Sequence, residues 1–251
     1  MKIISLGLGI QSTAMYLMSS LNHIERADYA IFADPGAELP DTYRLWEYLK
    51  DWAKYNNGIP LIKRKKSLYD DIVKGQNSYG DKWASIPAFT ESQGMVRRQC
   101  TAEYKINTVV KEVRRLHGLK KYQRMKPTIM YLGISIDEIQ RMKTSLLYNI
   151  TYEYPLIDRR ITRGECIKFL EERSFHNIKK SSCTFCPYHS NRQWKEIKQN
   201  YPEEWKKIIK VDEAIRNSSK RGSKDKLYLH RSLKPIKDAY LQEDQEELFM
   251  L

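Results

Sequence analysis

Short apolar strands alternate with helical segments along the first half of the chain, and this order constrains the fold more than any other feature. Parallel strands need crossover connections, which are usually helical. The alternation therefore predicts an α/β domain with a parallel sheet and helices on both of its faces. The expected strands are 2–6, 28–33, 59–63 and 128–134, and the expected helices are 11–21, 40–56 and 102–117.

The pattern changes after Tyr154-Pro155. Glycines and prolines make 75–98 a long surface loop, with a lid over a substrate as one option. The basic polar stretch 218–224 is typical of a linker. We expect two domains, an α/β domain over 1–160 and a helical extension over 161–251 packed on it. The helices expected in the extension are 162–173, 190–199 and 202–217.

Length and composition limit the class of protein. With 251 residues and 41% hydrophobic content, the chain can build one sizeable core and a small appended module. No segment approaches the roughly 18 apolar residues of a membrane span, and Met1-Lys2 leads straight into the first strand without a secretory signal. We therefore expect a soluble cytoplasmic protein with no membrane partner. Four cysteines in such a chain are more often metal ligands or reactive thiols than disulfides.

Basic residues exceed acidic ones, with 44 Lys and Arg against 31 Asp and Glu and a net charge of +13. They recur in clusters such as Lys63-Arg-Lys-Lys66, Arg114-Arg115 and Lys120-Lys121. Such an excess favours the binding of polyanions, so nucleic acid is a predicted partner. A solvated basic surface is the alternative.

The first strand runs into two close glycines before the first helix. Ser5 ends the strand, Gly7 and Gly9 follow, and Gln11-Ser12-Thr13 opens the helix. Helix N-termini have unpaired amides and partial positive charge, and glycine lets the backbone approach phosphate oxygens. The segment predicts a phosphate cradle, with a plain tight turn as the alternative. Gln11 and Met15 occupy the region where a Walker lysine or a third dinucleotide-binding glycine would stand, which excludes both of those loops.

A second polar segment, Phe32-Ala-Asp-Pro-Gly-Ala-Glu38, ends the second strand. Ligands of open parallel sheets bind beyond the carboxyl ends of the strands. Asp34 and Glu38 are therefore expected at the rim of a ligand site. The alternative is that Asp34 only caps a turn made by Pro35-Gly36.

The last predicted strand of the sheet breaks into a polar run with two carboxylates and two cations. Asp137 or Glu138 could hold Mg²⁺ on phosphates, and Arg141 or Lys143 could offset charge growing on a leaving pyrophosphate. The structural alternative is a helix start capped by Ser135, with Glu138 paired with Arg141. The two interpretations are compatible.

The four cysteines are candidate metal ligands. The Cys183-Thr-Phe-Cys186 turn puts two thiolates near one point, and Cys100 and Cys166 would complete a tetrahedral four-sulfur site. Zn²⁺ and a [4Fe–4S] cluster both satisfy that geometry. His189 could replace Cys166 in a Cys3His zinc site. A redox dithiol or simple buried packing are further alternatives.

Three of these segments, in this order, resemble the PP-loop ATP pyrophosphatases of the adenine nucleotide α-hydrolase superfamily, in its phosphoadenosine phosphosulfate reductase-like branch. Gly7–Thr13 is similar to the family's loop Ser-Gly-Gly-x-Asp-Ser-Thr and keeps its last glycine, serine and threonine. Gly7, Leu8 and Gln11 depart from it, standing where the family has serine, glycine and aspartate. The segment 32–38 and the run Gly-Ile-Ser-x-Asp-Glu-x-x-Arg are characteristic of the same branch. The similarity covers nearly the whole chain.

The resemblance implies a Rossmann-like fold of the HUP type with ATP and Mg²⁺ as ligands. In iron–sulfur members a cysteine after a basic segment joins a late Cys-x-x-Cys-Pro pair, so the resemblance favours a [4Fe–4S] cluster on Cys100, Cys166, Cys183 and Cys186. It implies catalytic roles for Asp137, Arg141 and Lys143. The implied nucleotide contacts are Ser5, Gly7, Gly9, Gln11, Ser12, Thr13, Asp34, Glu38, Gly133 and Ser135.

The implied activity is cleavage of ATP to AMP and pyrophosphate, which adenylates a substrate for sulfur transfer. The expected substrate is nucleic acid, in DNA phosphorothioation or tRNA thiolation, and the expected sulfur donor is an enzyme such as a cysteine desulfurase. DNA phosphorothioation ATP pyrophosphatases are the more similar in cysteine arrangement.

Two alternatives remain. Adenylylsulfate and phosphoadenylylsulfate reductases attack with a cysteine in a C-terminal Glu-Cys-Gly-Leu-His segment, whereas no cysteine follows Cys186 here, and His230-Arg231 lie where it is expected. The other alternative is a zinc-knuckle nucleic-acid-binding protein with a degenerate nucleotide fold.

Overall fold

The computed structural model describes residues 1–81, 86–92, 94–216 and 225–242. Contacts between residues divide the chain into two compact units, and both are discontinuous in sequence. Unit 1 comprises Met1–Asp34, Pro40–Lys65 and Lys105–Ser181. Unit 2 comprises Pro35–Leu39, Lys66–Tyr104 and Ser182–Leu251.

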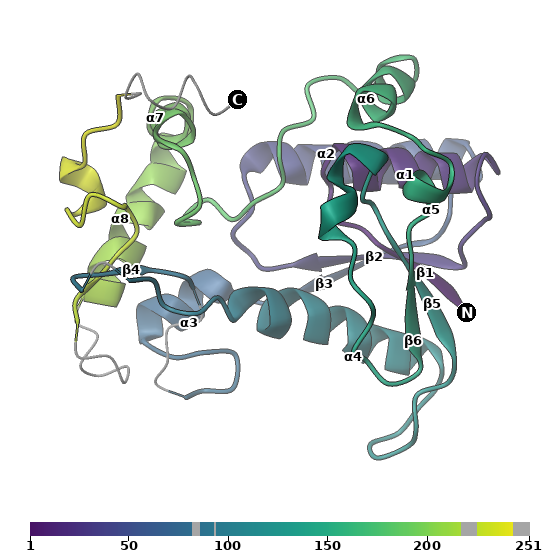
Figure 1. Cartoon of the computed structure of the whole chain (residues 1–251), viewed down its shortest axis with the longest axis horizontal. Coiled ribbons are helices and arrows are strands. Elements are labelled where there is room, and N and C mark those ends of the chain that lie inside the picture. The colour runs from purple at the N-terminus through teal and green to yellow at the C-terminus, as the bar shows by residue number, and fades with distance from the viewer. Residues whose placement is uncertain (82–85, 93, 217–224, 243–251) are drawn as a thin grey trace. The chain divides into compact units, whose positions relative to one another are not determined.

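Unit 1 contains a five-stranded parallel sheet with the strand order β3-β2-β1-β5-β6 (Figure 1). The central strand β1 pairs with β2 and with β5, so that Ile3 lies opposite both Tyr29 and Met130. This confirms the α/β fold class expected from the alternating pattern. The strands are β1 (Lys2–Ser5), β2 (Tyr29–Asp34), β3 (Leu61–Lys65), β5 (Thr128–Leu132) and β6 (Ile150–Glu153).

Helices cover both faces of this sheet because strand side chains alternate between two apolar layers. Ile4 and Phe32 join the cluster formed with α1, α2 and α6, whereas Ile3 and Ile31 join the cluster formed with α4. Figure 1 shows α1 and α2 on one face and α4 on the other. The helices of unit 1 are α1 (Ile10–Ser20), α2 (Pro40–Tyr55), α4 (Asn107–Leu116), α5 (Pro155–Asp158), α6 (Arg163–Glu171) and the 3₁₀ helix η2 (Ile136–Arg141).

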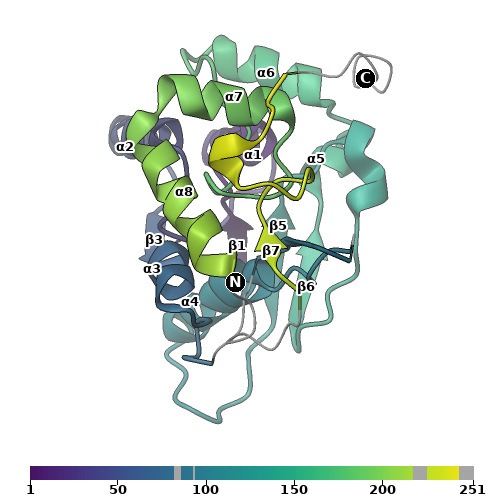
Figure 2. The ribbon, with the colours of Figure 1, turned by 90° about the vertical axis from the view of Figure 1, so that its left-hand side faces the viewer.

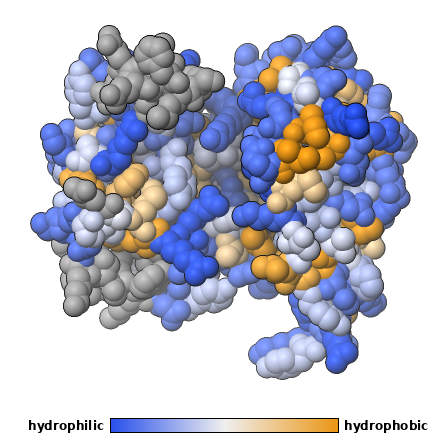
Figure 3. All heavy atoms as spheres, in the orientation of Figure 1, coloured by the Kyte–Doolittle hydropathy of each residue, from blue (hydrophilic) through white to orange (hydrophobic). Residues whose placement is uncertain are grey.

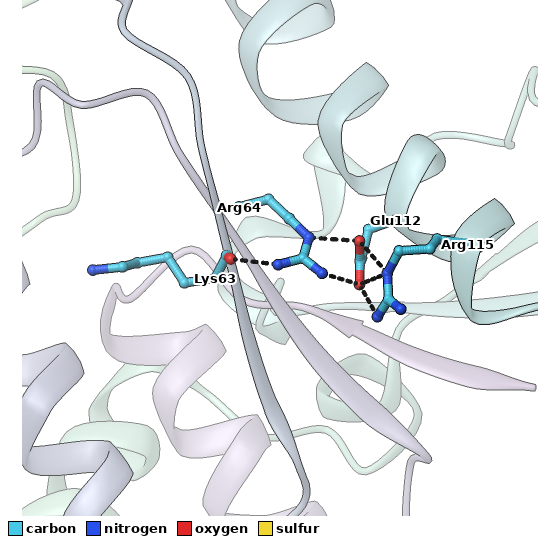
Figure 4. Close-up of polar contacts among 4 residues, drawn as sticks. All are labelled: Lys63, Arg64, Glu112 and Arg115. Carbon is cyan, nitrogen blue, oxygen red and sulfur yellow. Dashed lines mark hydrogen bonds and ion pairs between the residues drawn. The ribbon is translucent and has the colours of Figure 1, made fainter.

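A cluster of ion pairs links α4 to the edge strand β3 (Figure 4). Glu112 is buried and accepts hydrogen bonds from Arg64 Nε at 2.6 Å and Arg115 Nη2 at 2.7 Å. Burial alone would raise the pKa of Glu112, but the hydrogen bonds from Arg115 and Arg64 outweigh it and hold the pKa below its usual value. Both arginines keep solvent contact, which moderates the cost of burying the cluster.

Unit 2 is built mainly from helices around an aromatic core. The rings of Trp194 and Trp205 meet edge to face, with centroids 6.4 Å apart. Asp212, buried in α8, accepts hydrogen bonds from the backbone amides of Leu229 and Ile236, both at 3.0 Å, which ties the C-terminal segment to that helix. Its elements are α3 (Leu68–Lys74), α7 (Asn191–Asn200), α8 (Pro202–Arg216), the 3₁₀ helix η4 (Ile236–Asp238) and the antiparallel pair β4 (Phe89–Thr90) and β7 (Leu227–Tyr228).

The predicted elements and the observed ones differ in several places, of which three bear on the sheet and its surroundings. The helix expected over 102–117 begins as the π-helical turn η1 (Thr101–Ile106) and continues as α4. Both α3 and β6 occupy segments where no element was expected. The expected linker 218–224 lies outside the described residues, as do 82–85 and 93 of the expected loop 75–98. In the described part of the chain, no helix is long and apolar enough to cross a membrane.

Candidate nucleotide-binding site

The turn between β1 and α1 has the backbone geometry of an anion cradle. Gly9 is the N-cap of α1 with φ −96° and ψ 175°. The Ser12 hydroxyl donates to the Gly9 carbonyl at 3.2 Å and accepts from the Gly9 amide at 3.2 Å, while the Thr13 amide donates to the same carbonyl at 2.9 Å. Across the described ranges, the amides of Ile10, Gln11 and Ser12 meet no protein acceptor. Such amides at a helix start are available to an anion.

Leu8 holds the turn in place without covering it. Its φ of 56° is in the left-handed region, which is rare for a residue with a side chain. Its side chain is 1% exposed and belongs to the apolar cluster around α1. The side chain therefore points into the core and leaves the backbone of the turn clear.

The two glycines around the cradle lack side chains for different reasons. A Cβ at Gly9 would have no heavy atom within 4 Å, so the space beside it is open. A Cβ at Gly133 would lie 2.7 Å from Ser12 Cα and 2.8 Å from Ser12 N. Gly133 therefore allows the carboxyl end of β5 to pack directly against the first turn of α1. Gly133 thus has a packing role in the structure, in addition to the nucleotide contact predicted for it.

Polar side chains predicted for the site meet around Glu138. Gln11 Nε2 donates to Glu138 Oε2 at 3.2 Å and to Ser135 Oγ at 3.4 Å, and Arg141 pairs with the same carboxylate. Four residues from two predicted motifs thus come together at the first turn of α1. Glu138 is the carboxylate of this group, and its side chain is 28% exposed.

Asp137 faces a different partner. Its carboxylate accepts the backbone amide of Arg163 at 3.0 Å, at the first turn of α6. A hydrogen bond from Ser135, together with that amide, lowers the pKa of Asp137. Its carboxylate therefore serves the junction between η2 and α6.

Lys143 lies apart from the Glu138 group. Its amide donates to the Tyr154 hydroxyl at 2.9 Å, and that hydroxyl donates to the Lys143 carbonyl at 2.7 Å. The exposed side chain borders a pocket of about 350 Å³ that also includes Thr151 and Tyr152. No hydrogen bond or ion pair links its side chain to Gln11 or Arg141 within the described residues.

The remaining predicted nucleotide contacts of unit 1 are largely buried. Thr13 is fully buried and, in the part of the chain that the structure describes, its hydroxyl has no hydrogen-bond partner. Asp34 is 1% exposed and accepts a hydrogen bond from the Tyr43 hydroxyl at 2.9 Å, which joins the end of β2 to α2. Ser5 is half-buried at the end of β1, where it lies opposite Ile31 and Leu132. Ser12 is thus the cap hydroxyl nearest to solvent.

A pocket of about 410 Å³ shares Leu8 with the cradle. Two aromatic rings line it, Tyr48 from α2 and Phe175 from the segment after α6, with centroids 4.7 Å apart. Cations border it as well, including Arg44 and Lys179. Sequence reasoning missed this pocket because its lining comes from three distant segments, and two of them, 41–48 and 174–179, carry no motif.

Glu38 and three of the cysteines belong to unit 2. Glu38 forms an isolated antiparallel bridge with Cys183, and the Thr184 amide donates to the Ala37 carbonyl at 2.7 Å. The Cys-x-x-Cys segment forms a tight turn, with the Cys186 amide donating to the Cys183 carbonyl at 3.0 Å. His189 Nε2 donates to that same carbonyl at 2.9 Å, so this nitrogen offers no lone pair to a metal.

Cys166 lies in the core of unit 1, whereas Cys100, Cys183 and Cys186 lie in unit 2. Burial, with added repulsion from Asp137 and Glu165, raises the pKa of the Cys166 thiol to about 12. Among the residues that the structure describes, no three His, Cys, Asp or Glu side chains come together as a metal site. The four-sulfur site on Cys100, Cys166, Cys183 and Cys186 therefore stays a prediction.

Comparisons with known proteins give a distant structural likeness. No protein-family model matches the chain, and no curated protein matches it. Among solved structures, the chain is similar to the U34-tRNA thiolase NcsA from Methanococcus maripaludis with its [4Fe-4S] cluster. The sequence identity is 12% and the TM-score is 0.38, over 84% of this chain and 70% of that chain.

Proposed function

We propose that the chain is an ATP pyrophosphatase of the PP-loop type, which cleaves ATP to AMP and pyrophosphate. The observation that carries the proposal is the cradle at the carboxyl end of the central strand. There the first three amides of α1 meet no acceptor among the described residues, Leu8 is turned into the core, and open space adjoins Gly9. A helix start at this edge of a parallel sheet is where phosphates bind in α/β proteins.

The groups beside the cradle suit substitution at the α-phosphorus of ATP. A substrate oxygen attacks this atom, the bond to pyrophosphate breaks, and the substrate is left adenylated. Arg141 supplies positive charge next to the first turn of α1, where charge on the departing pyrophosphate is stabilised. Glu138 is the carboxylate best placed for Mg²⁺, which would neutralise phosphate oxygens when bound. Asp137 and Lys143 stay predicted contributors whose side chains act from outside this group.

The pocket that shares Leu8 with the cradle is the proposed site of the adenine ring. Its volume of about 410 Å³ and the rings of Tyr48 and Phe175 suit a flat aromatic base. A base in this pocket and phosphates on α1 would lie on either side of one residue. Nucleotide affinity would then depend on the anchoring of Leu8.

We further propose that the adenylated substrate is a nucleic acid that then receives sulfur, as in DNA phosphorothioation or tRNA thiolation. The net charge of +13 supports a polyanionic substrate. The sulfur donor, such as a cysteine desulfurase, would act after adenylation. No step here is assigned to an iron–sulfur cluster, because its ligand set stays a prediction.

Pyrophosphate release from ATP, measured with and without duplex DNA and unmodified tRNA, tests this function. Gly9→Val fills the open space over the helix start, and we expect at least a tenfold loss of ATP affinity with an unchanged fold. Gly164→Val, in the first turn of α6, is the matched control. The space beside Gly164 is open as well, because the one heavy atom within 4 Å of a Cβ there lies at 3.9 Å. Equal ATP affinity in Gly9→Val and the unmodified protein would refute the cradle.

A further inference from the structure

The connection between α4 and β5 is an exposed basic loop. Residues 117–127, called here the basic loop, project from unit 1 in both ribbon views (Figures 1 and 2). The space-filling view shows this projection in hydrophilic colours (Figure 3). The loop and its last residues before β5 expose the cations Lys120, Lys121, Arg124 and Lys126.

The backbone of the basic loop is fixed by specific contacts. Arg114 Nη2 donates to the Lys120 carbonyl at 2.8 Å, and the Lys120 amide donates to Gln123 Oε1 at 2.7 Å. Asn149 Nδ2 donates to the carbonyl of Met125, whose side chain is buried against the sheet. These contacts hold the ends and the turn, so the backbone of the loop needs little further ordering when the cations bind a ligand.

The charge of the basic loop is not neutralised locally. In the described ranges, none of its four cations pairs with a carboxylate. Glu112 is the only acidic residue between 111 and 126, and its carboxylate already forms ion pairs with Arg64 and Arg115. Lysines of α8 differ, because Lys206 and Lys207 pair with Glu203 and Glu204.

An aromatic ring stands among these cations. Tyr122 has a φ of 69°, a backbone conformation that is unfavourable for tyrosine. Its ring is 88% exposed, so burial of the ring does not offset that cost. Lys121 Nζ lies 5.0 Å from the ring centroid. Exposed aromatic rings beside cations are the groups that stack on bases while phosphates are neutralised.

The topology puts the basic loop at the edge of the sheet opposite the cradle. It precedes β5, which runs parallel to β1, whereas the cradle follows β1. The four residues of β1 alone separate the two edges by about 13 Å. A ligand that contacted both would have to span more than this distance around the edge of the sheet.

We propose that the basic loop binds the phosphate backbone of the polynucleotide substrate, several nucleotides away from the adenylated position. This inference rests on the proposed function for its substrate, and it adds that the substrate is a polymer recognised at a second place. A mononucleotide or a sulfonucleotide bound at the cradle would make no contact with the basic loop.

Fluorescence anisotropy with a 20-bp duplex and with a tRNA transcript tests the proposal. The variant Lys120→Gln/Lys121→Gln/Arg124→Gln should bind at least tenfold more weakly. Its slope of log affinity against log salt should fall by about 3, one for each phosphate contact. The matched control Lys206→Gln/Lys207→Gln/Lys237→Gln loses the same charge from cations that have carboxylate neighbours. The control should retain the unmodified affinity and slope.

Three outcomes would overturn the proposal. One is an equal loss in both variants, which would indicate net charge alone. Another is unchanged polynucleotide binding in the loop variant, which would assign the loop to an acidic protein partner. The third is an equal effect of the loop variant on a dinucleotide and on the 20-bp duplex. Pyrophosphate release without acceptor is measured in the same samples, so a failure of the proposed ATP chemistry is distinguished from a failure of the loop.

Discussion

Gly9 and Gly133 show how residues of the same type can serve opposite purposes near one site. Gly9 adjoins empty space that a ligand could fill, whereas Gly133 adjoins the backbone of Ser12 at less than van der Waals distance. The sequence marks both as glycines of strand ends, but it carries no information about which neighbour each one meets. Only the structure shows that the space beside Gly9 is open to a ligand, whereas the space beside Gly133 is filled by neighbouring backbone.

Gly133→Ala should therefore destabilise the fold by about 1–3 kcal/mol, because β5 or α1 must shift to admit the methyl group. Urea unfolding followed by circular dichroism measures this change. Gly7→Ala is the control, since a Cβ there meets only Ser12 Oγ at 3.7 Å, an ordinary contact. Wild-type stability in Gly133→Ala would contradict the close approach.

Cys166 should behave as a core residue. Because burial raises the pKa of its thiol to about 12, the reactive thiolate is scarce near pH 8, where an exposed cysteine of pKa about 8.5 is partly ionised. We expect iodoacetamide to modify the half-buried Cys100, Cys183 and Cys186 in the native protein at least tenfold faster than Cys166. Mass spectrometry of the peptides measures the rates.

The same residue provides a test of the predicted metal site. Cys166→Ala should leave the zinc or iron content of anaerobically purified protein unchanged. Loss of metal in this variant, or rapid labelling of Cys166, would show that the thiol leaves the core to act as a ligand.

Sequence reasoning located most of the groups around the cradle, but it did not predict which partner each of them contacts. Gln11, Ser135, Glu138 and Arg141 were each noted for a motif, and the structure joins them by hydrogen bonds. The adjacent Asp137 and Glu138 could not be told apart in sequence. A kink within η2 at Glu138 turns the two carboxylates to different partners, which no local pattern encodes.

At the scale of elements, the cluster of Glu112 with Arg64 and Arg115 predicts a specific dependence on pH. The pKa of Glu112 is lower in the folded chain than in the unfolded one, so the folded state binds fewer protons there. Its stabilising effect is complete above the unfolded pKa of about 4.3 and is lost as pH falls through the folded pKa.

Glu112→Gln should then lower the free energy of unfolding by about 1–2 kcal/mol at neutral pH, a value moderated by the exposure of both arginines. The difference from the unmodified protein should shrink as the pH falls below about 4. Chemical denaturation at several pH values measures it. A difference that stays constant with pH would show that the ionised carboxylate contributes nothing.

Element prediction succeeded where a strong pattern existed. Strands β1, β2 and β5 are apolar runs, and each was expected within two residues of its observed bounds. Strand β6 was missed because only Ile150 of its four residues is buried, which leaves no alternation to detect. Helix α3 was missed although Ser67 caps it by accepting the Asp70 amide, a signal present in the sequence.

At the scale of the whole molecule, the division into units depends on contacts between distant segments. Residues 161–181 belong to unit 1, where Cys166 and Leu170 of α6 and Phe175 of the following segment join the core around α1. Residues 66–104 belong to unit 2 together with 182–251. The sequence placed a boundary at residue 160 because the pattern of elements changes there, and a change of pattern does not report which core a helix joins.

A chain that ends at residue 160 should therefore lack a cooperative thermal transition. Each buried side chain contributed by α6 and the segment after it is worth about 1.5–3 kcal/mol, which is large against a typical stability of about 5–15 kcal/mol. A chain ending at residue 181 keeps this layer and should melt at a higher temperature by circular dichroism. Equal melting of the two chains would support the boundary at 160.

The aromatic packing gives each unit its own optical label. In unit 1, the ring of Trp46 contacts Phe32 at a tilt and that of Trp52 meets Phe175 edge to face. In unit 2, Trp194 and Trp205 form an edge-to-face pair. Two indoles held in such a fixed orientation couple their transitions and give a near-ultraviolet signature that vanishes when the pair separates. Replacing Trp46 and Trp52 with phenylalanine would leave tryptophans in unit 2 alone. The dichroism of the tryptophan band, at wavelengths where tyrosine does not absorb, would then follow the melting of unit 2 without any attached dye.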